Sequence, residues 1–262
     1  MRDVNILKNN GVDIEKALES LGDMEMYDDT ISEFLNEVNN KLDDIKKYKD
    51  ADDMPNYAIL VHSLKSDARY LGFTKLAELA YDHELKSKEN DVNYVNANYD
   101  SLIAEANRII VVAKSYVGNN VETVEVAATN TLETPTAKKT ILVADDSTII
   151  RNFIQKVFDD TYDVRVATDG VDVISVVTND SDNIAAMLLD LNMPNVNGYQ
   201  VLEYFKENNL FNKIPVSIIT GDDAKNTVEN AFKYPIVDVL TKPFNENDVK
   251  RVVEKTVQLK SN

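Results

Sequence analysis

Reactive side chains follow short apolar segments at several places in the second half of the chain. Each segment is long enough for a buried strand, and helical patterns separate the segments. If the segments are parallel strands, their carboxyl ends meet at one edge of a sheet, where such folds gather their chemistry. The residues that would meet there are Asp145, Asp146, Asp190, Thr220 and Lys242.

This set of side chains predicts phosphoryl chemistry. Three neighbouring carboxylates repel one another unless a cation lies between them, and oxygen ligands alone favour Mg²⁺. A carboxylate can attack phosphorus to form an acyl phosphate, while a metal ion and a lysine neutralise the transferring group. An aspartate after a strand is also a common helix cap. Five polar groups after four strands nevertheless favour a site over a set of caps.

The segment HSLKSDARYLG, residues 62–72, contains one of the two histidines of the chain. It lies in a helical pattern whose apolar stripe predicts the side that faces the core. At about 100° per residue, His62 lies roughly 140° from the centre of that stripe, which predicts the solvent face. The stripe consists of Tyr57, Leu60, Val61, Leu64, Ala68 and Leu71.

A histidine in that position is either a nucleophile or an ordinary member of a solvated face, and helix geometry leaves both open. Neutral imidazole attacks acyl phosphates near neutral pH. Lys65, one turn later, could offset the charge of a phosphoryl group, and Gly72 could let a partner approach. His83 has no lysine in the corresponding position, so it is predicted to be a packing or boundary residue.

The periodicity of the chain changes twice. Helical spacing dominates the first part, with short loops, which predicts an all-α bundle for residues 1–117. Residues 118–138 lose this spacing and are predicted to be a linker. Residues 139–262 alternate between strand and helix five times, which predicts an α/β domain with a five-stranded parallel sheet.

Composition excludes several classes of function. The net charge of −17 disfavours nucleic acid as a partner, because phosphate binding needs clustered basic residues. No apolar segment approaches the roughly 20 residues of a membrane span, so we expect no membrane insertion. The first residues lack the apolar core of a signal peptide, which predicts a cytoplasmic protein. With no cysteine, disulfides and thiolate metal sites are excluded.

The segments VADDS, LLDLNMPNVNGYQVL, IITG and TKPF follow one another in the second half of the chain. In this order and spacing they resemble the receiver domain of two-component response regulators, which has the CheY-like variant of the flavodoxin-like fold. The resemblance implies that Asp190 is the phosphoacceptor and that Thr220 and Lys242 contact the phosphoryl group. It also implies a cis peptide bond between Lys242 and Pro243.

The same resemblance implies a magnesium site. Asp146, Asp190 and the backbone carbonyl of Asn192 would bind Mg²⁺ directly, and Asp145 would act largely through water. Val239 stands where the family usually has Tyr or Phe, so we expect phosphorylation to change the neighbouring surface only slightly. Haloacid-dehalogenase-like phosphatases also use an aspartyl phosphate, but their nucleophile follows the first strand, which disfavours that alternative.

The HSLK segment and the glycine that follows it resemble the H-x-L-K motif of histidine phosphotransfer (HPt) domains. These domains are helical bundles of similar size that exchange phosphoryl groups with receivers. The resemblance implies that His62 is a second phosphoacceptor. Many relatives have Gly where this chain has Ser66.

Together the two resemblances predict a phosphorelay protein that carries phosphoryl groups on His62 and Asp190. We find no kinase motif for ATP, so we expect a carrier rather than an enzyme, with slow autodephosphorylation at most. The expected partners are a histidine kinase and other receiver or HPt proteins. We expect the chain itself to be a monomer or to associate only transiently. In the alternative, the receiver is a phosphorylation-gated switch and the bundle is a docking module. If the two halves dock, Ile149 is a candidate contact.

Overall fold

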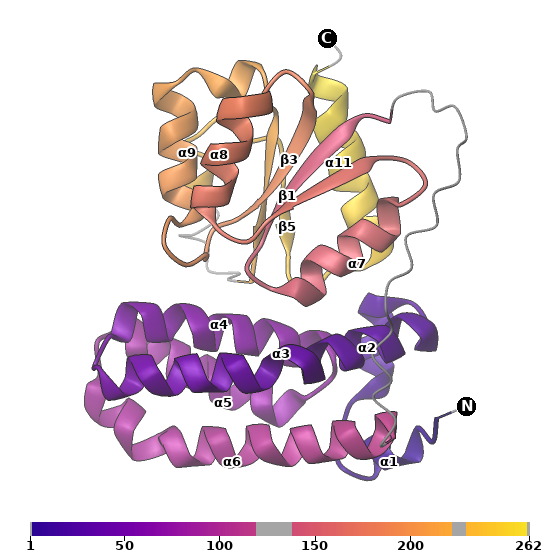
Figure 1. Cartoon of the computed structure of the whole chain (residues 1–262), viewed down its shortest axis with the longest axis vertical. Helices are drawn as coiled ribbons and strands as arrows, with labels where there is room; N and C mark the ends of the chain where they lie inside the picture. Colours follow the sequence, from indigo (N-terminus) through magenta and orange to yellow (C-terminus); the bar gives the residue numbers. More distant parts are fainter. Residues whose placement is uncertain (1, 119–137, 222–228, 261–262) are drawn as a thin grey trace.

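The computed structural model describes residues 2–118, 138–221 and 229–260, and it has a helical part and an α/β part (Figure 1). The helical part confirms the predicted bundle, with long helices packed side by side. Residues 119–137 of the predicted linker lie outside the described residues. The helices are α1 (Asn5–Lys8), α2 (Ile14–Leu21), α3 (Met24–Asp50), α4 (Met54–Tyr70), α5 (Thr74–Lys88) and α6 (Val92–Val117).

The long helices begin at aspartate caps. The side chains of Asp23, Asp53 and Asp91 each accept a hydrogen bond from a backbone N–H in the first turn of the helix that follows. Gly72, just after α4, has φ +71°, and a Cβ there would lie 2.2 Å from the carbonyl oxygen of Asp13. The prediction that Gly72 makes room for a partner is therefore wrong, because the room is taken by the chain's own N-terminal segment.

The α/β part has the predicted five-stranded parallel sheet, in the order β2-β1-β3-β4-β5. Most of the predicted helix at 222–232 falls on residues 222–228, outside the described residues. The strands are β1 (Thr140–Ala144), β2 (Asp163–Ala167), β3 (Ile184–Asp190), β4 (Val216–Thr220) and β5 (Val239–Thr241). The helices are α7 (Thr148–Phe158), α8 (Gly170–Asp180), α9 (Gly198–Glu207) and α11 (Glu246–Lys260), with a short 3₁₀ helix, η1 (Leu210–Asn212).

Alternation along the strands divides the apolar residues between the two faces of the sheet. Ile141 and Val143 of β1 pack in one cluster with residues of α7 and α11. Leu142 and Ala144 belong to a second cluster with residues of α8 and α9. Both faces are therefore covered, as expected for a parallel sheet, and the carboxyl edge is left for other contacts.

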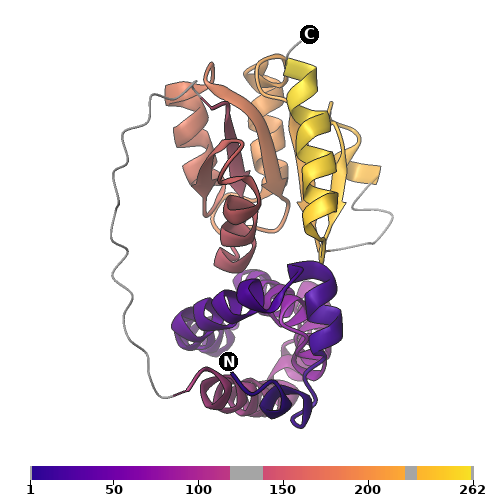
Figure 2. The same ribbon diagram turned by 90° about the vertical axis from the view of Figure 1, so that its right-hand side faces the viewer.

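The helical bundle lies against that carboxyl edge (Figure 2). The first apolar cluster continues without a break from the α/β part into the bundle. Tyr70 at the end of α4 contacts Phe153 of α7 and Phe244 after β5, with ring centroids 6.3 and 5.7 Å apart. Ile149, the expected docking residue, is buried in the same cluster. The two parts thus share one apolar core, although both carry net negative charge.

Within the three described ranges, no helix combines the length and the apolar character needed to cross a bilayer.

Candidate functional site

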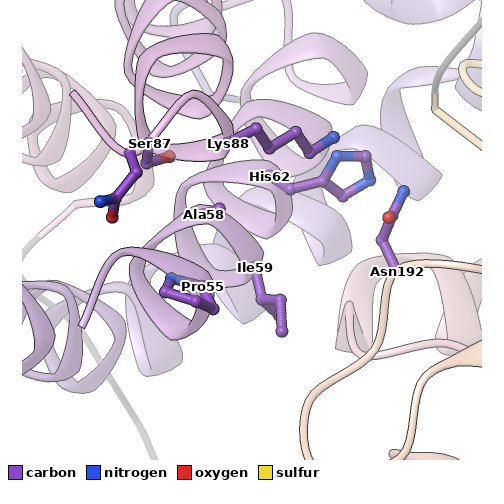
Figure 3. A pocket seen from close by; sticks show the side chains of 8 residues that line it. Pro55, Ala58, Ile59, His62, Ser87, Lys88 and Asn192 are labelled. Atoms are coloured by element: carbon purple, nitrogen blue, oxygen red, sulfur yellow. The ribbon is translucent and has the colours of Figure 1, made fainter.

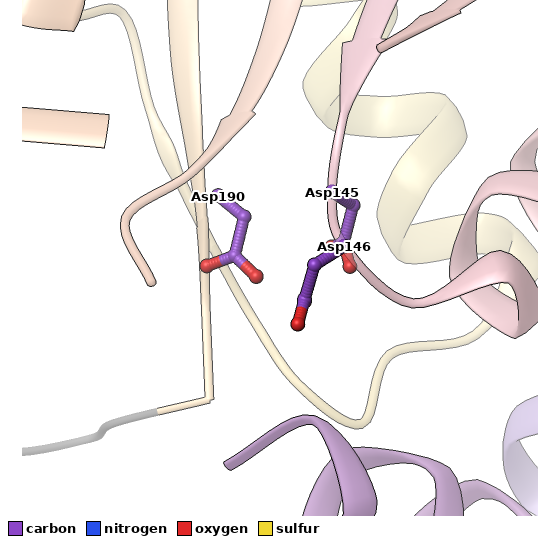
Figure 4. A group of neighbouring side chains, drawn as sticks. All are labelled: Asp145, Asp146 and Asp190. Atoms are coloured by element: carbon purple, nitrogen blue, oxygen red, sulfur yellow. The ribbon is translucent and has the colours of Figure 1, made fainter. Parts of the chain in front are cut away.

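Three carboxylates meet at the carboxyl edge of the sheet. Asp145 and Asp146 follow β1, and Asp190 ends β3, the strand beside it. One oxygen from each of the three side chains lies within 4.8 Å of the other two. Figure 4 shows the three side chains as neighbours. Asp145 and Asp190 are fully buried. The sheet therefore brings together the acidic residues singled out from the sequence.

Lys242 lies among these carboxylates. Its Nζ is 2.6 Å from Oδ2 of Asp190 and 2.8 Å from Oδ2 of Asp145. Its backbone N–H donates to the carbonyl oxygen of Thr220, the buried last residue of β4, at 2.7 Å. The peptide bond between Lys242 and Pro243 is cis, as the resemblance implied. An ammonium and a hydroxyl residue thus flank the acidic cluster.

The cluster carries more negative charge than one lysine offsets. Burial raises the pKa of Asp145 to about 8; Lys242 opposes this shift, and the charges of Asp190 and Asp146 add to it. Burial and the charge of Asp190 also raise the pKa of Asp146. Burial alone would lower the pKa of Lys242, but the surrounding carboxylates raise it instead. A second cation would relieve this repulsion.

The donor set fits Mg²⁺. Hard cations of this size prefer carboxylate and carbonyl oxygens, and Asp146 Oδ1 is buried without a hydrogen-bond partner among the described residues. Asn192, expected to supply a carbonyl ligand, donates its backbone N–H to Asp190 Oδ1 at 3.1 Å. Val239, which we expected to limit the response to phosphorylation, is half-buried at the start of β5.

His62 is buried, with 1% of its surface exposed, so the prediction that it faces solvent is wrong. Sequence periodicity correctly located the bundle core on α4, but it could not reveal what covers the opposite face. Every residue from 61 to 68 is buried, because α4 lies between the rest of the bundle and the sheet edge (Figure 1).

Glu84 of α5 holds the His62 ring. Its Oε1 lies 2.7 Å from His62 Nδ1, and its Oε2 accepts from Lys65 Nζ at 2.5 Å. Burial raises the pKa of Glu84, but hydrogen bonding to His62 and the charges of His62, Lys65 and Lys88 bring it well below its usual range. An ionised Glu84 can only accept, so Nδ1 carries the proton. In the neutral ring, Nε2 then keeps its lone pair.

Two details of this cluster were not foreseen. Glu84 itself has no signal in the sequence, because the contact depends on how α5 packs against α4. Lys65 lies 3.3 Å from Nδ1, on the side of the ring that Glu84 binds. It therefore supports Glu84, and its expected role in offsetting the charge of a phosphoryl group stays a prediction.

The other side of the His62 ring faces the sheet edge. His62 Nε2 is buried without a hydrogen-bond partner among the described residues. A Cβ placed on Gly221, next to Thr220, would lie 3.3 Å from this nitrogen. Figure 3 shows the ring pointing toward Asn192. The two residues help to line a cavity of about 460 Å³. The structure thus aims Nε2 at the loops that surround the acidic cluster.

His83 is enclosed within the bundle. Its Nδ1 lies 2.7 Å from the hydroxyl of Tyr57, and its ring packs edge-on against Tyr94. Burial lowers its pKa. This environment agrees with the packing position expected from the sequence.

Comparisons with known proteins match both parts. The family model described as Hpt domain matches residues 29–109, and the one described as response regulator receiver domain matches residues 141–254. Chemotaxis protein CheY1 of Helicobacter pylori is 29% identical over 116 residues, which cover 44% of this chain and 93% of that protein. A two-component response regulator-like protein of Arabidopsis thaliana, APRR5, is 28% identical over 119 residues, 44% of this chain and 21% of that protein.

Among solved structures, a response regulator receiver domain protein from Clostridium thermocellum is 24% identical. The match covers 47% of this chain and 96% of that one, with a TM-score of 0.43. The two family models together account for both described parts of the fold. The chain therefore belongs to the two-component proteins, with an Hpt domain followed by a receiver domain, and it is a phosphorelay protein.

Proposed function

We propose that His62 and Asp190 are the two phosphoacceptors and that they exchange a phosphoryl group within one chain. The observation that carries this proposal is the orientation of the His62 ring. Glu84 binds Nδ1, and the free Nε2 lies against Gly221 at the edge of the receiver's acidic cluster. A nucleophile is thus held toward the site where an acyl phosphate would stand.

In the transfer, the lone pair of Nε2 attacks the phosphorus of an acyl phosphate on Asp190. The new N–P bond forms as the bond between phosphorus and the Asp190 oxygen breaks, and the electron pair returns to the carboxylate. Lys242 already contacts that carboxylate and stabilises it as a leaving group. Glu84 stabilises the positive charge that the ring acquires. The reverse transfer follows the same path.

Asp145, Asp146 and Asp190 would hold Mg²⁺, which neutralises phosphoryl oxygens when it is bound. Thr220, the last residue of the neighbouring strand β4, would donate its hydroxyl to the phosphoryl group. The carbonyl of Asn192 as a metal ligand stays a prediction, and so does the small surface response expected from Val239.

The Hpt and receiver domains carry phosphoryl groups, and we propose that they do so without catalytic turnover except slow autodephosphorylation. The phosphoryl donors and acceptors would be histidine kinases and other receiver or Hpt proteins. The chain would act in the cytoplasm, as a monomer or in transient complexes. The domain boundaries at residues 117 and 139 stay proposals from the sequence; α6 ends at Val117 and β1 begins at Thr140.

A second function rests on the shared apolar core. Because Tyr70, Phe153 and Phe244 pack together, the Hpt domain could serve mainly to dock on the receiver and be released by phosphorylation. In that case His62 would be a contact residue and would never carry a phosphoryl group.

Labelling of the full chain tests the proposal. With Mg²⁺ and a small acyl-phosphate donor, the wild type should acquire a base-labile label, and Asp190→Asn should not. Asp172→Asn, on the exposed first turn of α8, is the matched control. Removing Mg²⁺ with a chelator should also prevent labelling. Full labelling of Asp190→Asn would show that the aspartate is wrongly assigned.

A further inference from the structure

A hydrogen bond joins the two domains beside the acidic cluster. The hydroxyl of Ser147 donates to Asp67 Oδ1 of α4 at 2.7 Å. Both residues are buried, Ser147 fully and Asp67 to 5% exposure. Ser147 is also tied to the receiver's site, because its backbone N–H donates to Asp145 Oδ1 at 2.9 Å. This contact therefore links α4 directly to the loop that presents the carboxylates.

Lys41 of α3 completes the arrangement. Its Nζ bonds to Asp67 Oδ2 and donates to the hydroxyl of Ser63 at 2.9 Å. Burial lowers the pKa of Lys41, but the charges of Asp67 and Asp146 raise it above its usual value. A carboxylate placed this close to an acidic cluster would otherwise be repelled. Lys41 offsets that repulsion and leaves Oδ1 of Asp67 facing the receiver.

We propose that Asp67, held by Lys41, is a specificity-determining residue that recognises the Ser147 hydroxyl and seats the Hpt domain over its own receiver. This inference rests on the proposed exchange between His62 and Asp190.

The physical reason is the satisfaction of a buried charge. With Ser147 present, both oxygens of Asp67 have partners in the docked state. A receiver without a donor at this position would leave Oδ1 buried and unpaired, and a receiver with a carboxylate there would place two anions in contact. The apolar core supplies contact area without choosing among receivers. Asp67 provides the specificity for one receiver, as buried polar groups commonly do at interfaces.

A second polar contact fixes the same orientation. The backbone N–H of Phe244 donates to the hydroxyl of Tyr70 at 3.1 Å. Phe244 lies two residues after Lys242, as Ser147 lies two residues after Asp145. Residues of α4 thus contact two loops of the receiver's site, one on each side of Asp190. The amide of Phe244 also reports on docking independently of any phosphoryl transfer.

The test uses full-length variants. Ser147 also caps α7, accepting from the N–H of Ile150 at 3.4 Å, so removing its hydroxyl would disturb the receiver itself. Ser147→Asp keeps a good helix cap but opposes the carboxylate of Asp67. Combining it with Asp67→Ser restores a hydroxyl–carboxylate pair with the roles exchanged. Asp44→Ala, on an exposed position of α3, is the matched control.

Each variant is loaded at Asp190 with a small acyl phosphate and Mg²⁺, and the acid-labile label on His62 is then followed at several dilutions. In the wild type, transfer should be first-order and independent of dilution. Asp67→Ala should slow it by about tenfold, the usual effect of a lost hydrogen bond to a charged group. Ser147→Asp should slow it further, and the exchanged pair should recover most of the rate. Loading of Asp190 should not fall in Asp67→Ala, because this substitution leaves the receiver unchanged and an undocked receiver is more accessible.

Wild-type transfer rates in both Asp67→Ala and Ser147→Asp would overturn the inference, as would a parallel loss of Asp190 loading in Asp67→Ala. If His62 accepts no label even in the wild type, the proposed exchange fails, and hydrogen exchange at the Phe244 amide still decides the docking role. Faster exchange there in Asp67→Ala, but not in Asp44→Ala, supports recognition. Equal exchange in the two variants refutes it.

Discussion

The two histidines of this chain have similar burial but different surroundings. Each is 1% exposed, and each has one ring nitrogen bound to a neighbouring side chain of the bundle. His83 is surrounded by Tyr57 and Tyr94 of its own domain, whereas His62 meets Gly221 of the other domain. Burial alone therefore does not distinguish a packing histidine from a candidate phosphoacceptor. The direction of the unbound nitrogen does.

The partners of the two rings also differ in charge. Tyr57 offers His83 a neutral hydroxyl, and burial lowers the pKa of that histidine. Glu84 offers His62 a carboxylate, and Lys65 and Lys88 in turn bind Glu84. A phosphorylated imidazole carries positive charge on its ring, which a carboxylate at Nδ1 stabilises and a neutral partner does not. The same residue type is thus prepared for two different roles by its hydrogen-bond partner.

Labelling should separate the two histidines completely. His62→Gln should accept no acid-labile phosphoryl group, because the nucleophilic ring nitrogen Nε2 is lost. His83→Gln should accept the wild-type amount. The measurement is acid-labile label per chain after the receiver has been loaded at Asp190. Equal labelling of His62→Gln and the wild type would show that His62 is not a phosphoacceptor. The docking function would then be the better proposal.

Removing the charge of Glu84 should have the next largest effect. In Glu84→Gln, the His62 ring loses its anionic partner, so transfer to His62 should slow by at least about tenfold while loading of Asp190 stays unchanged. Glu105→Gln is the matched control, since Glu105 is another buried glutamate of the bundle, paired with Lys75 and Arg108.

The ¹⁵N chemical shifts of His62 supply a second measurement of the role of Glu84. In the wild type they should show the proton on Nδ1, and in Glu84→Gln they should show a mixture of tautomers. If transfer slows equally in the Glu84 and Glu105 variants, the effect is on the fold of the bundle and Glu84 has no positioning role.

The smallest effect should appear in the stability of the bundle as pH falls. The pKa of His83 in the folded chain is below its usual value. Below about pH 6.5, His83 therefore binds a proton in the unfolded chain but not in the folded chain. Above that pH, His83 makes its full contribution to the free energy of unfolding. This contribution falls by at most about 1.4 kcal/mol per pH unit as the pH drops toward the folded pKa.

Urea unfolding followed by far-ultraviolet circular dichroism, between pH 7.5 and 5, measures this slope. His83→Gln should flatten it. The folded pKa of Glu84 is also lowered, so its contribution should be lost only below about pH 4.3, in a separate window. An unchanged slope in His83→Gln would show that another group controls stability in this range.

The sequence by itself determined the elements and the receiver's acidic cluster. Helical and strand periodicities are local, and the ends of parallel strands must meet, so Asp145, Asp190 and Lys242 could be placed together without coordinates. The apolar stripe of α4 likewise identified the side that faces the bundle core.

Only the tertiary structure decided what covers the other side of α4. Glu84 reaches His62 across 22 residues of sequence, and Ser147 reaches Asp67 across 80. Such contacts depend on how whole elements pack, and no spacing within one helix encodes them. The position of His62 in the helical pattern was therefore compatible with exposure to solvent. The structure shows that the receiver covers this side of α4. The burial of His62, the orientation of Nε2 and the support from Glu84 follow from the packing of two domains.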